Sequence, residues 1–262
     1  MMNNKPEKLL EANDIVMKFG GLKALNRVTL HVNEDEVLGL IGPNGSGKTT
    51  FFNVTTGIYR LTEGDILFAN RSIVGKKPQE IAHMGIIRTF QTSRLWFDLS
   101  VLDNLLLGMY MRPKGSFFSR LFQFEKNRKE IKNHAIEALE ILSVFNKELA
   151  DNPYRIAREL ALVDRRRIEI CRALLAKPKL LLLDEPSAGM DPSETSELME
   201  DIKKLRAKKE KLGIIIIEHD MTVISSIADR VAVLNFGEKI AQGSFEEIRK
   251  NKLVREAYLG RE

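Results

Sequence analysis

The sequence predicts an α/β fold with a mostly parallel sheet, an antiparallel β flap and an inserted helical subdomain. Two apolar runs, residues 180–183 and 214–217, have the length and continuity of strands buried on both faces of a parallel sheet. A third run, residues 37–41, leads into a glycine-rich turn and then into a helical pattern. Residues 101–176 carry helical periodicity and lack strand candidates. Strands alternating with helices indicate a doubly wound core, into which the central helical stretch is inserted.

The N-terminal part of the chain predicts the antiparallel flap. The expected strand segments are residues 9–12, 15–19 and 28–32. Gly20-Gly21 separates the third segment from the other two. After the glycine-rich turn the expected elements are, in order, a helix from Thr50 to about Gly57, a strand at 65–68, a helix at 78–83, a strand at 85–91, and helices at 101–111, 125–142 and 165–176. The last three helices form the subdomain inserted at about residues 98–177.

The sheet resumes after this insertion. The expected elements are a strand at 179–185, a helix at 193–211 with Ser193 as a possible N-cap, a strand at 213–219, strands at 230–235 and 239–242, and a closing helix at 253–258. The C-terminal helical segment is placed at about residues 244–262. The whole chain, residues 1–262, is expected to form a single domain.

Composition indicates an ordinary globular protein. Hydrophobic residues make up 44% and charged residues 29%, and the net charge of +5 is too small to imply nucleic acid binding. No apolar run is long enough to span a bilayer, and the N-terminus lacks the apolar core of a signal peptide. The single cysteine, Cys171, excludes an internal disulfide and fits a reducing cytosol. Its apolar neighbours predict a packing role.

One segment, from Arg112 to Lys129, concentrates positive charge. It contains six basic residues and one acidic residue, and aromatic residues lie between them in the sequence. Such a segment could contact a membrane surface or a membrane-embedded partner. The alternative is a helical hairpin with inward aromatic and solvated basic side chains. We favour the hairpin, because Phe117, Leu121 and Phe124 also fit a core-facing helical stripe.

The turn after residues 37–41 has the pattern of a P-loop. Its residues are Gly42, Pro43, Asn44, Gly45, Ser46, Gly47, Lys48 and Thr49, with Thr50 directly behind them. Strand, glycine-rich turn and helix are the context that this motif requires, which argues against a purely structural turn. The glycines let backbone N–H groups surround a phosphate, and the helix N-terminus adds partial positive charge. Lys48 is expected to reach the β- and γ-phosphates of ATP, and the Thr49 hydroxyl to bind Mg²⁺.

Four further polar residues stand where parallel strands are expected to end. Asp184 follows four leucines and is expected to hold Mg²⁺, while Glu185 is expected to act as general base on the attacking water. His219 ends the next strand and is expected near the γ-phosphate. The amide of Gln91 can touch both Mg²⁺ and water. Each residue alone could be an ordinary polar strand end, but the carboxyl ends of parallel strands meet at one edge of a sheet. We therefore expect a single catalytic site there.

These motifs resemble those of ABC ATPases. The residues that carry the resemblance are the P-loop as Walker A, Gln91 as Q-loop, Leu180 to Glu185 as Walker B, Ser187 to Asp191 as D-loop, and His219 as switch histidine. The resemblance implies that Phe19 stacks on adenine. Three further stretches, Arg88 to Thr92, Glu169 to Leu174 and Ala257 to Gly260, are similar to the ATP-binding subunits of branched-chain amino acid importers. Sister importers for urea or other amides share much of this pattern.

The resemblance implies an ATPase that couples ATP hydrolysis to uptake, located peripherally at the cytoplasmic face of the cell membrane. Its implied partners are membrane permease subunits, contacted through the loop from Gln91 to Phe97 that includes Trp96, and a second ATPase subunit, identical or paralogous. A solute-binding protein outside the membrane would act indirectly. Nucleic acid is not an expected partner.

The segment from Leu160 to Asp164 departs from the family's Leu-Ser-Gly-Gly-Gln signature, which closes over the γ-phosphate held by a partner subunit. Ala161 has no hydroxyl, and Leu162 and Val163 bring Cβ atoms where close backbone approach is wanted. Asp164 adds negative charge near a phosphate, or serves as a helix cap. One hypothesis is a weak signature, which would give a heterodimer with one strong and one weak ATPase site. The alternative is that backbone donors at 162–164 suffice.

Two other functions compete with transport. A soluble ABC protein of translation or DNA repair usually carries two fused cassettes or a long coiled-coil insertion, and a single cassette of 262 residues argues against both. A nucleotide sensor with weak turnover would fit the unusual signature. Glu185 and His219 argue against a sensor, because it has no need of a water-activating carboxylate. The transported substrate is selected by other subunits and cannot be read from this chain.

Overall fold

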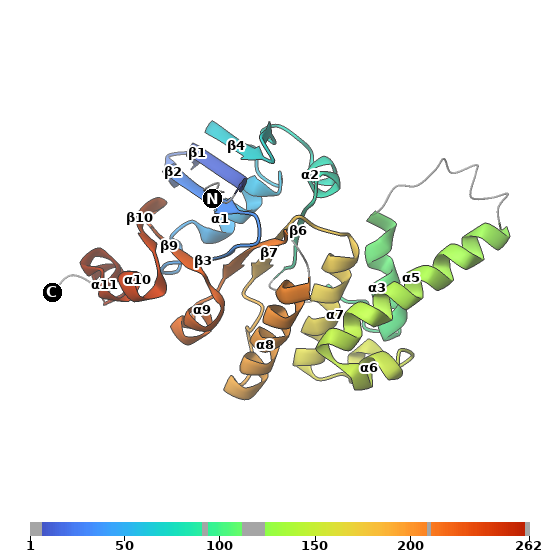
Figure 1. Ribbon diagram of the computed structural model, residues 1–262. Coiled ribbons are helices and arrows are strands. Elements are labelled where there is room, and N and C mark those ends of the chain that lie inside the picture. The colour runs from blue at the N-terminus through green and yellow to red at the C-terminus, as the bar shows by residue number, and fades with distance from the viewer. Residues whose placement is uncertain (1–6, 91–93, 112–123, 209–210, 260–262) are drawn as a thin grey trace, which may run out of the picture. The chain divides into compact units, whose positions relative to one another are not determined.

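The computed structural model describes residues 7–90, 94–111, 124–208 and 211–259 (Figure 1). The chain divides into two compact units. The first contains Met1–Arg88, Lys179–Pro186 and Lys208–Glu262, and the second contains Thr89–Pro178 and Ser187–Ala207. Each unit is therefore assembled from segments that are far apart in the sequence.

A six-stranded sheet in the order β10-β9-β3-β8-β7-β6 lies at the centre of the first unit. Its strands are β3 (Val37–Ile41), β6 (Ile86–Arg88), β7 (Leu180–Asp184), β8 (Gly213–Ile217), β9 (Arg230–Asn235) and β10 (Glu238–Gly243). Only β10 pairs antiparallel to its neighbour; the other pairs are parallel. Every residue of β3, β7 and β8 is buried, which explains their continuous apolar sequences. The predicted α/β class with a mostly parallel sheet is confirmed.

The same unit contains the predicted antiparallel flap as a second sheet, in the order β2-β1-β4-β5. Its strands are β1 (Lys8–Phe19), β2 (Leu22–Asn33), β4 (Glu63–Phe68) and β5 (Arg71–Ser72). The prediction of two separate strands within residues 9–19 was wrong, because β1 is continuous. The register shifts between Ala12 and Ile15, where Asp14 has a φ of 46° and its N–H donates to Thr29 Oγ1. A bulge interrupts the alternation of side chains without ending the strand.

The helices of the first unit are α1 (Lys48–Thr55), α2 (Pro78–Met84), α9 (Met221–Ile227), α10 (Phe245–Lys250) and α11 (Lys252–Leu259). The C-terminal segment, predicted to close with one helix, holds two. Asn251 has an extended backbone (φ −70°, ψ 126°) and separates α10 from α11. Helix α9 was not predicted.

The second unit is helical in its described part. It contains α3 (Val101–Leu107), η1 (Gly108–Met111), α5 (Phe124–Phe145), α6 (Lys147–Asp151), η2 (Ala157–Glu159), α7 (Leu162–Leu175) and α8 (Pro192–Lys208) without its last residue. The prediction of Ser193 as a cap was wrong, because α8 begins earlier. Asp191 precedes the helix, and its carboxylate accepts a hydrogen bond of 2.9 Å from the Glu194 N–H. The Asp191 N–H donates to Glu194 Oε2 in return.

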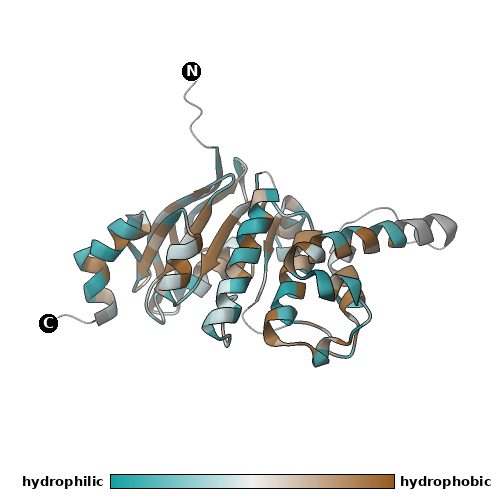
Figure 2. Cartoon of the chain, turned by 60° about the horizontal axis from the view of Figure 1, so that its bottom comes forward, coloured by the Kyte–Doolittle hydropathy of each residue, from teal (hydrophilic) through white to brown (hydrophobic). Residues whose placement is uncertain are grey.

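The hydropathy pattern agrees with this arrangement. Figure 2 shows hydrophobic residues along the strands and helices that carry both hydrophobic and hydrophilic residues. Cys171 is buried in α7, and burial raises the pKa of its thiol, as expected for a packing residue. None of the helices that the structure describes is both long and apolar enough to cross a bilayer.

Candidate nucleotide-binding site

The glycines of the P-loop are required by contacts with neighbouring backbone. Gly42 has a φ of 149°, and a Cβ atom there would lie 2.0 Å from the Leu234 carbonyl oxygen. Gly47 has a φ of 107°, and its Cβ would lie 2.6 Å from the Ala24 carbonyl oxygen. The loop is therefore fixed against β9 and β2, and no side chain fits at either glycine.

Two polar side chains of this loop suit an anion. The buried Ser46 Oγ has no hydrogen-bond partner within the described residues, although buried hydroxyls normally have one. Lys48 Nζ donates to the carbonyl oxygens of Gly42 (2.6 Å) and Pro43 (3.0 Å). Burial lowers the pKa of Lys48, and the carboxylates of Glu185 and Asp184 oppose that shift. A phosphate would offer this ammonium group a stronger acceptor than a carbonyl.

Asp184 is the last residue of β7, and Glu185 follows it. Strand β7 pairs with β8, which in turn pairs with β3. Glu185 adopts a φ of 46°, so the regular strand ends between the two carboxylates. Asp184 Oδ2 lies 2.5 Å from Arg88 NH2, whereas Glu185 Oε1 lies 2.7 Å from His219 Nε2. Neighbouring carboxylates thus have different partners. The structure brings Lys48, both carboxylates and His219 to one edge of the sheet, as the sequence predicts.

Arg88 was missed by sequence reasoning. It ends β6, its side chain is buried, and it touches both Asp184 and Asn53 of α1. A basic residue at the end of a short strand carries no local signal of a buried ion pair. The predicted strand over 85–91 is also too long, since β6 ends at Arg88. Gln91 lies outside the described residues.

Phe19, expected to stack on adenine, is the last residue of β1. Its side chain is 42% exposed, which excludes the core. Its ring meets the ring of Tyr59 edge to face, with centroids 5.2 Å apart. An exposed aromatic face can take a planar base.

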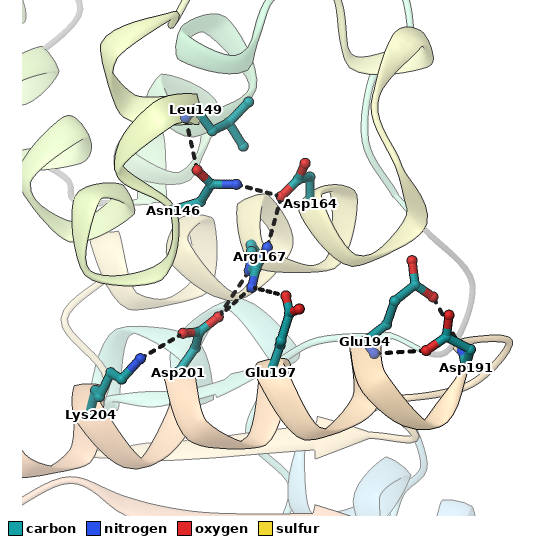
Figure 3. Close-up of polar contacts among 9 residues, drawn as sticks. All are labelled: Asn146, Leu149, Asp164, Arg167, Asp191, Glu194, Glu197, Asp201 and Lys204. Atoms are coloured by element: carbon teal, nitrogen blue, oxygen red, sulfur yellow. Dashed lines mark hydrogen bonds and ion pairs between the residues drawn. The ribbon is translucent and has the colours of Figure 1, made fainter.

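The start of α7 lies in the second unit, where Figure 3 shows its polar contacts. Ala161 precedes the helix and supplies no side-chain cap. Asp164 Oδ1 accepts from Arg167 NH1 (3.0 Å) and from Asn146 Nδ2 (2.9 Å). The Arg167 guanidinium also binds Asp201 and Glu197 of α8. Asp164 is therefore neutralised within its own unit and does not cap the helix.

The other two arginines of this helix start are also engaged within the second unit. Arg165 donates to the Arg158 carbonyl oxygen and lies over the Phe97 ring. Arg166 donates to the Phe90 carbonyl oxygen and pairs with Glu169. Trp96 is 65% exposed, although its backbone is held by Asn104. Residues 112–123 of the basic segment lie outside the described residues.

Comparisons with known proteins agree with this site. Residues 25–188 match the family described as ABC transporter, and residues 238–262 match the family described as branched-chain amino acid ATP-binding cassette transporter. The chain is 43% identical over 257 residues to the high-affinity branched-chain amino acid transport ATP-binding protein LivG of Salmonella typhimurium, covering 97% of this chain and 98% of the relative. It is 40% identical over 255 residues to BraF of Pseudomonas aeruginosa, described in the same words, covering 96% of this chain and 98% of that one.

The solved structures that resemble this chain are also ATP-binding cassettes of ABC transporters. A nucleotide-free ATP-binding cassette from an ABC transporter is 34% identical and superposes with a TM-score of 0.82, covering 97% of this chain and all of that one. The ADP conformation of an ATP-binding cassette of an ABC transporter is also 34% identical, with a TM-score of 0.83 over 97% of this chain and 99% of that one.

Proposed function

Because the chain belongs to the ABC transporter ATPase family, we propose that it is the ATP-hydrolysing subunit of an importer for branched-chain or related amino acids. The observation that supports the enzymatic part best is the convergence of the P-loop, Asp184, Glu185 and His219 at one edge of the sheet. The substrate class is supported by the match of residues 238–262 and by the names of the relatives.

In this proposal each residue of the site has a separate role in phosphoryl transfer. The P-loop amides and Lys48 bind the β- and γ-phosphates, and Phe19 stacks on the adenine. Glu185 takes a proton from the attacking water, while His219 orients that carboxylate through the 2.7 Å contact. The left-handed backbone at Glu185 keeps this carboxylate separate from Asp184.

Magnesium fits the oxygen donors of the proposed site. The Thr49 hydroxyl and the Asp184 carboxylate are hard oxygen ligands, and the Gln91 amide is a third by analogy. Among the described residues, no group of three His, Cys, Asp or Glu side chains could hold a metal. That suits Mg²⁺, which usually binds through one or two carboxylates together with substrate phosphates. When bound, Mg²⁺ would neutralise charge on the transferred phosphate.

The proposed partners follow from the family. The loop from Gln91 to Phe97, with its exposed Trp96, is proposed to contact a membrane permease, which would place the chain at the cytoplasmic membrane surface. We propose further that the two units form a single ATPase domain that pairs with a second ATPase subunit. A solute-binding protein would act through the permease. Importers for urea or other amides are the second candidate, since they share much of the sequence pattern of this subfamily.

Uptake measurements test this function. In the source organism, deletion of the gene is expected to lower uptake of labelled leucine, and the wild-type gene is expected to restore it. Lys48→Ala should fail to restore uptake, because the phosphates lose their principal cation. Lys8, an exposed lysine outside the P-loop, provides the control: Lys8→Ala should restore uptake in full. Undiminished leucine uptake with lost urea uptake in the deletion strain would favour the second candidate.

The unusual helix start of α7 gives a second prediction. Changing residues 161–163 to Ser-Gly-Gly supplies a hydroxyl and frees the backbone for a partner's γ-phosphate, so ATP turnover by the assembled transporter should rise about tenfold. Ala161→Ser alone keeps Leu162 and the buried Val163, and therefore separates the hydroxyl from any loss of packing. Unchanged turnover in both variants would show that the present segment already suffices.

A further inference from the structure

Arg88 is a buried cation at the end of β6, an edge strand of the six-stranded sheet. Its side chain is 6% exposed and that of its partner Asp184 is 5% exposed. Its NH2 group lies 2.5 Å from Asp184 Oδ2, and its NH1 group donates to Asn53 Oδ1 at 2.6 Å. The guanidinium carbon also lies 5.3 Å from the centroid of the Phe52 ring. One side chain therefore joins the end of β6, the end of β7 and the helix that follows the P-loop.

These contacts fix the direction of the Asp184 carboxylate. A guanidinium is planar, so the bond to Asn53 sets the plane in which the second bond to Asp184 is made. Within the described residues Oδ2 takes the ion pair, and no hydrogen bond reaches Oδ1. The carboxylate is thereby left with one oxygen held by the protein and one oxygen available. A metal ligand held in this way binds in one geometry with little loss of entropy.

We propose that Arg88 is a positioning residue that holds Asp184 by Oδ2 and leaves Oδ1 for Mg²⁺. The proposal rests on the proposed ATPase site. Through Asn53, Arg88 also ties the metal ligand to the same helix whose first residues, Lys48 and Thr49, belong to the P-loop. The Asp184 carboxylate and the P-loop residues are thus anchored to the same helix.

The alternative role for Arg88 is neutralisation of a buried carboxylate, which would affect stability alone. Arg88→Lys distinguishes the two roles, since it keeps the charge but replaces the planar fork by a rotating ammonium group. We expect the Mg²⁺ concentration that gives half of the Mg²⁺-dependent increase in ATP affinity to rise about tenfold. ATP affinity measured in EDTA should not change, because the P-loop and Lys48 are intact.

Two other variants complete the experiment, with ATP binding measured by calorimetry across a Mg²⁺ series. Asn53→Ala leaves the Arg88 and Asp184 side chains unchanged and removes only the hydrogen bond from Arg88 to Asn53. It should therefore shift the Mg²⁺ dependence in the same direction by a smaller factor. It also keeps the test valid if Arg88→Lys does not fold. Arg230→Lys is the matched control, because Arg230 makes a similar pair with Glu36 at the start of β9. It should change stability but not Mg²⁺ dependence.

The outcomes separate this proposal from the proposed function. Wild-type Mg²⁺ dependence in both Arg88→Lys and Asn53→Ala would overturn the positioning role, as would an equal loss of ATP affinity with and without Mg²⁺. If the wild-type protein bound ATP without any effect of Mg²⁺, the proposed metal site itself would be wrong, and the role of Arg88 with it.

Discussion

Glu185→Gln protein is expected to bind ATP but to hydrolyse it at least about a hundredfold more slowly than the wild type, within the range for loss of a general base. The amide has nearly the shape of the carboxylate and can still meet His219, but it cannot accept the proton of the attacking water. Phosphate release at saturating Mg²⁺ and ATP measures turnover, and equilibrium dialysis measures binding. The loss should therefore appear in kcat and not in the affinity for ATP.

Glu63→Gln is the matched control for this prediction. Glu63 is an exposed residue of β4 that pairs with Lys18, and the same change of group there should leave turnover intact. If Glu185→Gln protein kept more than a tenth of wild-type turnover, Glu185 would not be the general base. His219 would then be the next residue to replace.

The same variant reports on the partner subunit. Slow hydrolysis should trap ATP between two subunits, so light scattering after size exclusion can detect a dimer. A homodimer that forms only with ATP would mean that the start of α7 closes over a γ-phosphate despite Ala161, Leu162 and Val163. A monomer that binds ATP would point to a different, obligate partner subunit. The pairing of Asp164 with Arg167 favours closure, because it removes a negative charge from the helix start.

Arg167→Met is expected to lower the free energy of unfolding of the second unit by about 3–5 kcal/mol, the usual cost of removing one partner from a buried ion pair. Arg167 is the common partner of Asp164, Asp201 and Glu197, as Figure 3 shows. Burial already raises the pKa of Asp201, against the opposing effect of Arg167. Methionine has a similar length, so the change removes charge and hydrogen bonds more than volume. Urea denaturation and hydrogen exchange of the α7 and α8 amides measure the loss.

Two comparisons make this result specific. Arg158→Met removes an exposed partner of Asp98 and should cost less than about 1 kcal/mol. Arg167→Met combined with Asp201→Asn should recover part of the lost stability, because it removes one of the carboxylates left without its cation. An equal cost for Arg158→Met and Arg167→Met would mean that the buried network contributes no more than a surface pair.

The sequence predicted those parts of the structure that have a local signal. Residues 180–183 and 214–217 are buried strands because nothing but a fully covered position suits such runs, and the P-loop follows from its own spacing. The bulge at Asp14 and the break at Asn251 were missed because each depends on one residue's backbone angles. The start of α8 was misplaced because Pro192, which suits a first helical position, was passed over for a serine.

Some residues of the candidate site could be predicted from the sequence, and others could not. Lys48, Asp184, Glu185 and His219 stand in recognisable patterns, and strand order brings them together. The Arg88 ion pair joins residues 96 positions apart, and its existence depends on which side chains meet in the folded core. The hydrogen-bond partners of Asp164 could not be predicted from the sequence either, since one of them, Asn146, is the N-cap of another helix, α6.

Peptide oxygens make the tightest contacts of two P-loop glycines. Leu234 and Ala24 meet Gly42 and Gly47 through their carbonyl groups, which every amino acid possesses. The side chain at the partly buried position 24 can therefore change during protein evolution or redesign while its carbonyl keeps this contact, whereas position 234 must stay apolar because the Leu234 side chain lies in the core. The two glycines have no such freedom, because any added carbon would collide with those oxygens. A mutational scan of the first unit should accordingly find tolerance at Ala24 and near-complete intolerance at Gly47, although the two residues are in direct contact.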